Sequence, residues 1–235
     1  VKRRSKYLLI NLQKNLTIIC HLGMTGKFFI SQEKKKFKTS FYYYFSNKDN
    51  KHNHIIFRLN KKITLIYNDV RKFGFIKIIP TSNLSSNMHM CSLGPEPLSK
   101  KFNFVYFKKY IANKRIKLKD LMMNQKFVSG LGNIYVNEIL FLSKLNPKKN
   151  IEQIKNINIE KILFFTKKTL LKSIKEGGSS IKDFNSSDGK AGNFQQLFNV
   201  YAREGKKCIK TNCNQLISRI IISGRSTFIC KSCQK

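Results

Sequence analysis

The sequence contains few acidic residues and no long hydrophobic run. Its 235 residues include 12 Asp and Glu against 46 Lys and Arg, which gives a formal net charge of +34 at pH 7. Such a charge predicts a polyanionic partner, nucleic acid first and an anionic membrane surface second. No stretch approaches the roughly 18 apolar residues of a membrane span, which excludes an integral membrane protein. Residues 1–15 contain too short an apolar stretch for a secretory signal.

Arginine is also scarce, and this changes how the charge is interpreted. Only 8 of the 46 basic residues are Arg, while Lys, Ile and Asn are abundant. Their codons are A/T-rich, so the composition is typical of a low-GC genome that raises the Lys content without a functional demand. DNA binding needs only about 6–10 phosphate contacts, so most of the charge is expected to be solvated surface. The hydrophobic content of 41%, with 19 Phe, excludes a disordered basic tail.

The first third of the chain is predicted to be β structure. Short β-branched and aromatic runs separated by turns favour a sandwich or a barrel-like sheet. The predicted strands are residues 7–13, 16–22, 27–32, 54–59, 63–69 and 71–79. Residues 80–99 hold three of the four Pro, five Ser and one Gly, which is typical of a linker.

Helical periodicity begins after this linker. Apolar residues at positions i, i+3, i+4 and i+7 predict helices at residues 103–113, 117–125, 133–145 and 158–177. Residues 179–194 form a long polar loop that contains glycine, the kind of loop that usually carries function. The predicted order is therefore a sheet, a helical bundle and a small cysteine-rich β module.

Four of the six cysteines have the spacing of a metal site. Cys208-x4-Cys213 and Cys230-x2-Cys233 are two close pairs separated by the length of a hairpin, which favours a tetrahedral four-thiolate zinc site. Two disulfides or unrelated buried thiols are the alternatives. A module this small cannot build a sufficient core alone, so a metal would supply its folding energy. Cys20 and Cys91 stand alone and are expected to be ordinary buried residues.

Arg225 lies in the predicted hairpin between the two cysteine pairs. Gly224 permits a tight turn that would present Arg225 from a rigid support. Such an arginine is well suited to reach a phosphate or a duplex groove. The alternative is a solvated turn residue.

Eight segments follow one another in order along nearly the whole chain: RRSKYLL (3–9), HLGMTG (21–26), DVRKFG (69–74), LGPEPLS (93–99), SGLGNIYVNE (129–138), EGGSSIKDF (176–184), SDGKAGNF (187–194) and the terminal four-cysteine ribbon. Together they resemble the formamidopyrimidine-DNA glycosylase family of bacterial repair enzymes. The ribbon departs from the family in having four residues between the first two cysteines, where two are usual.

The resemblance implies an α+β multidomain protein that binds damaged double-stranded DNA in a cleft. The implied parts are an incomplete N-terminal β-sandwich (1–80), a linker (81–100), a helical domain with a helix–two-turn–helix element (101–198) and a zinc finger (199–235). Loop 179–194 would close over a flipped base. The implied protein is a monomer with one structural Zn²⁺ ion, located in the bacterial cytoplasm with the nucleoid and not at a membrane.

The implied activity is base-excision repair. The family flips an oxidised purine, such as 8-oxoguanine or a formamidopyrimidine, out of the duplex. A secondary amine then displaces the base and forms an imine, and β- and δ-elimination cut the strand. The protein would therefore be a DNA glycosylase with abasic-site lyase activity.

The resemblance also assigns roles to individual residues. Lys6 and Arg225 correspond to catalytic positions that assist elimination and hold phosphates. The DNA-contacting positions are His52, Arg71, Arg115, Lys119 and Asn133. Met24, Arg71 and Phe73 correspond to the three residues that fill the gap left by the flipped base, which requires an apolar plug, a cation facing the orphan base and a ring wedged between base steps.

Simpler interpretations exist for several of these residues. Met24 and Phe73 could be core residues. Asn133 could be only a helix N-cap, and Lys6 could be solvated surface.

The family nucleophile, an N-terminal proline in a Pro-Glu-Leu-Pro-Glu segment, has no counterpart in these residues. We expect that about fifty residues are missing before Val1, by comparison with a first domain of usual size. A fragment or a wrongly placed start, a decayed gene and a functional remnant are the competing explanations. For the chain as written, weak or no excision with retained DNA and zinc binding is expected. The alternatives are a non-catalytic zinc-dependent DNA-binding remnant and an unrelated ribosomal or RNA-binding zinc ribbon.

Overall fold

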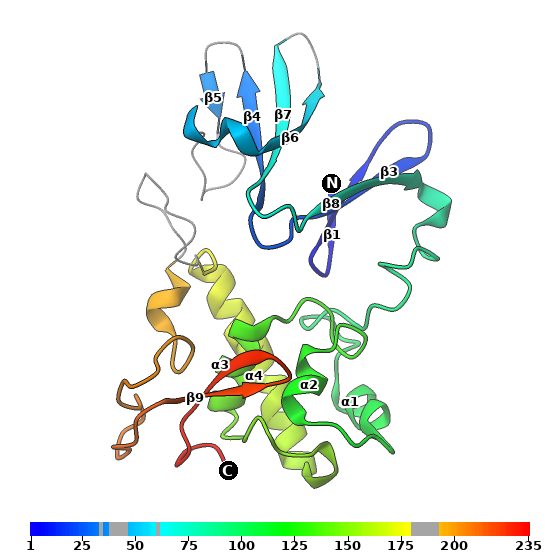
Figure 1. Cartoon of the computed structure of the whole chain (residues 1–235). Helices are drawn as coiled ribbons and strands as arrows, with labels where there is room; N and C mark the ends of the chain where they lie inside the picture. The colour runs from blue at the N-terminus through cyan, green and yellow to red at the C-terminus, as the bar shows by residue number, and fades with distance from the viewer. Residues whose placement is uncertain (33–34, 38–46, 60–61, 180–192) are drawn as a thin grey trace. The chain divides into compact units, whose positions relative to one another are not determined.

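A computed structural model describes residues 1–32, 35–37, 47–59, 62–179 and 193–235. The chain divides into two compact units, each with its own core. Unit 1 includes Val1–Met90, and unit 2 consists of Cys91–Gly178 and Asn193–Lys235 (Figure 1). The boundary falls inside the proline- and serine-rich segment 80–99.

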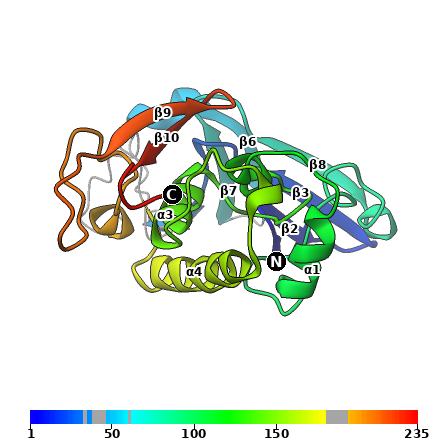
Figure 2. The ribbon, with the colours of Figure 1, turned by 90° about the horizontal axis from the view of Figure 1, so that it is seen from below.

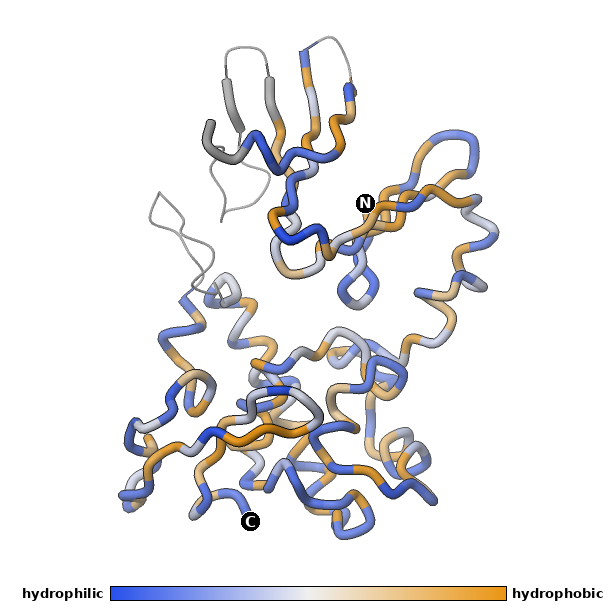
Figure 3. Tube along the Cα trace, in the orientation of Figure 1, coloured by the Kyte–Doolittle hydropathy of each residue, from blue (hydrophilic) through white to orange (hydrophobic). Residues whose placement is uncertain are grey.

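Unit 1 contains two antiparallel four-stranded sheets. The first has the order β1-β2-β3-β8, with β1 Lys2–Arg4, β2 Tyr7–Asn11, β3 Leu16–His21 and β8 Phe75–Pro80. The second has the order β5-β4-β7-β6, with β4 Gly26–Gln32, β5 Lys35–Phe37, β6 Asn53–Arg58 and β7 Ile63–Asp69. β3 and β8 consist largely of hydrophobic residues, while the turn between β2 and β3 is hydrophilic (Figure 3).

The strand prediction is wrong in two respects: one strand begins later than predicted, and two strands were missed. The strand expected from residue 71 begins at Phe75, because residues 70–74 form a loop in which Lys72 has a φ of 56°. β1 and β5 are rich in Lys and Arg and have no hydrophobic alternation, so the pattern did not reveal them. Unit 1 also contains the short helices η1 (Asn47–His52) and η2 (Thr81–Asn83).

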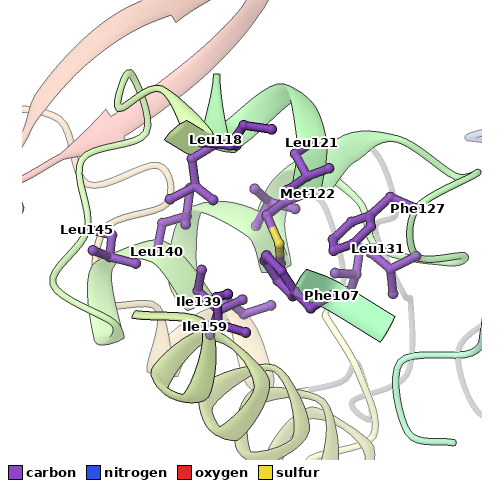
Figure 4. Close-up of a cluster of buried hydrophobic side chains, with 14 of the residues drawn as sticks. Phe107, Leu118, Leu121, Met122, Phe127, Leu131, Ile139, Leu140, Leu145 and Ile159 are labelled. Atoms are coloured by element: carbon purple, nitrogen blue, oxygen red, sulfur yellow. The ribbon is translucent and has the colours of Figure 1, made fainter. Parts of the chain in front are cut away.

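Unit 2 is built on helices α1 (Phe104–Ile111), α2 (Leu118–Met123), α3 (Asn133–Leu142) and α4 (Asn156–Lys175). α1 and α3 end earlier than predicted, and Asn113 (φ 60°) and Lys144 (φ 58°) adopt the left-handed conformation just beyond them. The helices share one core, and Figure 4 shows its side chains converging from all four. Its labelled members are Phe107, Leu118, Leu121, Met122, Phe127, Leu131, Ile139, Leu140, Leu145 and Ile159.

The cysteine module packs on α3. The module contains a hairpin of β9 (Ser218–Ile222) and β10 (Arg225–Ile229). Two short helices lie earlier in the chain, η3 (Ile151–Gln153) before α4 and η4 (Phe194–Leu197) after it. Figure 2 shows α3 between this hairpin and α4. A second hydrophobic cluster, which includes Phe141, Val200 and Phe228, lies between α3 and the module. Among the described residues, no helix combines the length and apolar character needed to cross a membrane.

Candidate nucleic-acid interface

The four cysteines of the predicted metal site come together. One ligand atom from each of Cys208, Cys213, Cys230 and Cys233 lies within 4.8 Å of all the others. The Sγ atoms of Cys208 and Cys233 are 3.9 Å apart, and those of Cys213 and Cys230 are 3.6 Å apart. A disulfide needs about 2.05 Å, whereas a zinc tetrahedron with Zn–S bonds of about 2.3 Å has S–S edges of about 3.8 Å. The geometry fits a four-thiolate metal site and not the disulfide alternative.

The chemistry of one thiol also suits a metal ligand. A hydrogen bond from the backbone of Gln215 lowers the pKa of Cys213 to about 7, whereas burial raises the pKa values of Cys208 and Cys233. Of the two remaining cysteines, Cys20 is buried as expected, but Cys91 is exposed, so the expectation for Cys91 was wrong.

Buried polar residues of α3 fix the module in place. Glu138 is fully buried, and its carboxylate accepts hydrogen bonds from the backbone N–H groups of Asn199, Val200 and Tyr201 at 2.9–3.0 Å and from Asn199 Nδ2 at 2.6 Å. Asn137 Oδ1 accepts a bond of 2.7 Å from the backbone of Phe228. Sequence reasoning did not single out either residue, although polar residues on the buried face of an apolar helix are a usable signal.

The β9–β10 turn presents Arg225 at its tip. Arg225 pairs with Ile222 across a two-residue turn in which Ser223 and Gly224 have φ values of 48° and 71°. Positive φ at both central residues defines a type I′ turn, which matches the twist of a hairpin. Arg225 is exposed, as a residue that contacts a partner must be.

Lys119 and Asn133 lie beneath this tip. Lys119 Nζ donates to Thr227 Oγ1 at 2.5 Å and to the Ser226 carbonyl at 3.3 Å. Asn133 Nδ2 donates to the same carbonyl at 2.9 Å. The N-cap of α3 is Gly132, so the interpretation of Asn133 as only an N-cap is wrong. Burial, and then the charge of Arg225, lower the pKa of Lys119 to about 8.

In unit 1, Asp69 organises the loop that follows β7. Its buried carboxylate accepts hydrogen bonds from Thr25 Oγ1 (2.5 Å), Gly74 N (2.8 Å), Tyr67 OH (3.1 Å) and Arg71 N (3.3 Å). Burial alone would raise the pKa of Asp69, but these bonds outweigh burial and hold the pKa below its ordinary value. The carboxylate is therefore the fixed centre of the loop.

The two segments that connect the sheets, HLGMTG and DVRKFG, meet at Gly23. This residue has a φ of 61°, and a Cβ there would lie 2.8 Å from both Gly74 N and Phe73 C. The contact supports Met24 and Phe73, which are 53% and 61% exposed. The Arg71 guanidinium lies 4.8 Å from the centre of the Phe73 ring. The interpretation of Met24 and Phe73 as core residues is therefore wrong.

Lys6 occupies the turn between β1 and β2 and is exposed. Next to it, the rings of Tyr7 and His21 pack in a tilted arrangement, with centroids 5.0 Å apart and planes at 55°. Burial, followed by the charges of Lys6 and His89, lowers the pKa of His21. The exposure of Lys6 fits both a lysine that contacts DNA and a solvated surface lysine.

The hydrogen bonds and ring contacts described above do not include the two remaining candidates, His52 and Arg115. His52 is half-buried at the end of η1. The side chain of Arg115 is 91% exposed and forms an ion pair of 3.0 Å with Glu152. Of the predicted loop 179–194, residues 180–192 lie outside the described residues.

Comparisons with known proteins identify the family of the chain. Residues 1–76 match the formamidopyrimidine-DNA glycosylase N-terminal domain model, and residues 93–185 match the H2TH domain model of the same family. The curated formamidopyrimidine-DNA glycosylase of Rickettsia bellii is 39% identical over 235 residues, covering 100% of this chain and 81% of the relative. That of Rhodopseudomonas palustris is 36% identical over 239 residues, covering 99% and 81%.

Solved structures give the same result. A Lactococcus lactis FPG mutant, in complex with DNA that contains Fapy-dG, superposes with a TM-score of 0.84 at 32% identity, covering 100% of this chain and 80% of that one. A second structure is a complex between the Lactococcus lactis Fpg and DNA with an abasic site, with the same TM-score and coverage. The chain therefore belongs to the formamidopyrimidine-DNA glycosylase family of DNA-repair glycosylases.

Proposed function

We propose that the protein recognises oxidised purines, such as 8-oxoguanine and formamidopyrimidines, in damaged double-stranded DNA. The observation that carries this proposal is the exposed group of Met24, Arg71 and Phe73 on two braced loops. A flipped base leaves a gap in the duplex, and inserting an apolar side chain and a ring offsets the cost of unstacking. The cation beside the ring is available to hydrogen-bond the orphan base.

Arg225 and Asn133 contact DNA phosphates in this proposal. Arg225 supplies a guanidinium group at the tip of a rigid hairpin, and Asn133 donates a hydrogen bond to the carbonyl of the adjacent Ser226. His52 and Arg115 add further backbone contacts. The Arg115–Glu152 ion pair is exposed and weak enough to exchange for a phosphate.

The site of Cys208, Cys213, Cys230 and Cys233 holds one structural Zn²⁺ ion. Four thiolates leave no open coordination position, so the ion would stabilise the module and take no part in bond breaking. The two short S–S distances support this assignment.

The reaction that we propose is base excision followed by β- and δ-elimination. Lys6 would assist elimination and hold a phosphate near the lesion, and Arg225 would assist δ-elimination. The family's amine nucleophile lies in a Pro-Glu-Leu-Pro-Glu segment that these 235 residues do not contain. The cysteine cluster and the exposed Arg225, which can serve DNA binding without base excision, support a second candidate, a zinc-dependent DNA-binding protein without excision activity.

The test is to incubate the chain with duplexes that contain 8-oxoguanine opposite cytosine, an abasic site or no lesion, with and without borohydride. We expect tighter binding of the two damaged duplexes than of the undamaged one, and the extent of covalent trapping separates the excision reaction from the second candidate. Equal binding of all three duplexes would contradict the proposal. Efficient trapping would overturn the second candidate, and its loss in Lys6→Ala, but not in the exposed control Lys2→Ala, would identify Lys6 as the amine.

A further inference from the structure

Lys119 is a cation held inside unit 2. Its side chain is only 1% exposed, and both of its recorded acceptors, Thr227 Oγ1 and the Ser226 carbonyl, belong to β10, more than 100 residues away along the chain. The resemblance to the family predicts a DNA contact at this position. A covered ammonium group cannot reach a phosphate without leaving these acceptors.

The placement of Lys119 is electrostatically costly. Burial, and then the charge of Arg225, lower the pKa of Lys119, and among the described residues only Asp120, on the same helix, raises it. Two neighbouring cations at one end of a hairpin are stabilised by an anion that contacts the exposed one. Only Arg225 of the pair is exposed to receive it.

Two helices converge on one peptide group of the hairpin. Lys119 of α2 and Asn133 of α3 both donate to the Ser226 carbonyl, and Lys119 also binds the next side chain, Thr227. Ser226 directly follows Arg225. The orientation of the guanidinium therefore depends on groups that these two helices hold.

We propose that Lys119 is a positioning residue that acts on DNA through Arg225, by fixing Ser226 and Thr227 so that the guanidinium points at a phosphate. This inference rests on the proposed function, because Arg225 must contact DNA for its direction to matter. Lys119 itself makes no DNA contact.

The test is a double-mutant cycle on the full chain, with Lys119→Met, Arg225→Ala and the combined variant. A fluorescent duplex with a tetrahydrofuran abasic analogue is titrated, and the zinc content of each variant is measured. Lys117→Met is the matched control, because it removes an exposed lysine two residues away on the same segment.

We expect Lys119→Met to weaken binding on the order of tenfold, the effect of misdirecting one charge-assisted contact. In the Arg225→Ala background the same change should have less than a twofold effect, because the group that it positions is gone. Equal effects in both backgrounds would mean that Lys119 contacts DNA directly and would overturn the inference. If wild type does not bind the duplex, or if Arg225→Ala binds as wild type does, the proposed function of Arg225 fails instead.

Thr227→Val provides a second route if Lys119→Met does not retain zinc. It removes the hydroxyl acceptor but keeps the lysine and a similar side-chain volume. We expect a weaker duplex affinity that again depends on Arg225. Additive effects of Thr227→Val and Arg225→Ala would contradict the inference.

A proton balance tests the electrostatic link between Lys119 and Arg225. A phosphate at Arg225 would offset the guanidinium charge and raise the pKa of Lys119 from about 8, so binding at pH 8–8.5 should take up protons. Calorimetry in two buffers with different ionisation enthalpies measures this uptake. It should disappear in Lys119→Met, and unchanged uptake in that variant would contradict the inference.

Discussion

Two buried carboxylates, one in each unit, each accept a set of hydrogen bonds, but their donors lie at very different distances along the sequence. Asp69 accepts four hydrogen bonds, three of them from residues 67–74. Glu138 also accepts four, all from residues 199–201, more than 60 positions away. Asp69 shapes a loop that displays Phe73, whereas Glu138 joins a metal module to a helix. In the proposed function, the local network supports the side chains that would meet the lesion, and the long-range network supports the module whose Arg225 would contact a phosphate.

Metal removal should give the largest difference between the two units, because it removes the folded module to which Glu138 is hydrogen-bonded. The module has a small core, so chelation should unfold residues 199–235 and leave the sheets of unit 1 folded. Cys230→Ser should have the same effect. Zinc content and amide hydrogen exchange of both units measure it. Loss of protection in unit 1 as well would contradict the separation.

Glu138→Gln should have the next largest effect. The amide would place an N–H₂ group among three backbone N–H donors, and we expect a loss of about 2–4 kcal/mol in unfolding free energy. Chemical denaturation of zinc-loaded protein measures this loss. The partly exposed Glu152→Gln is the control and should stay within about 0.5 kcal/mol.

Asp69→Asn should cost less, about 1–3 kcal/mol, because two of its four donors come from neighbouring hydroxyls that are able to reorient. The folded pKa of Asp69 lies below its unfolded value. Its stabilising contribution is therefore complete above the unfolded pKa, about 3.9, and is lost as the pH falls through the folded value. A wild-type stability curve that falls no further below pH 4 than that of Asp69→Asn would contradict this account.

The sequence predicted the order of the parts and the metal ligands because local signals carry them. Cysteine spacing, a proline-rich segment and helical periodicity can all be recognised within a short stretch of sequence. Glu138, Asn137 and the burial of Lys119 were not predictable in this way, because their partners lie 61–108 residues away. Residues 71–74 were assigned to a strand because the bends of this loop depend on bonds to Asp69 and not on its own hydrophobic pattern.

The comparison between the two units is tested most directly by one set of titrations, with Phe73→Ala and Arg225→Ala each measured on lesion-containing and undamaged duplexes at fixed salt. A phosphate contact carries no sequence or lesion information. Arg225→Ala should therefore weaken both duplexes by a similar factor, on the order of tenfold. Phe73→Ala should weaken only the lesion duplex by about that factor. A uniform loss in Phe73→Ala, or a loss confined to the lesion duplex in Arg225→Ala, would contradict the division of work between the two units.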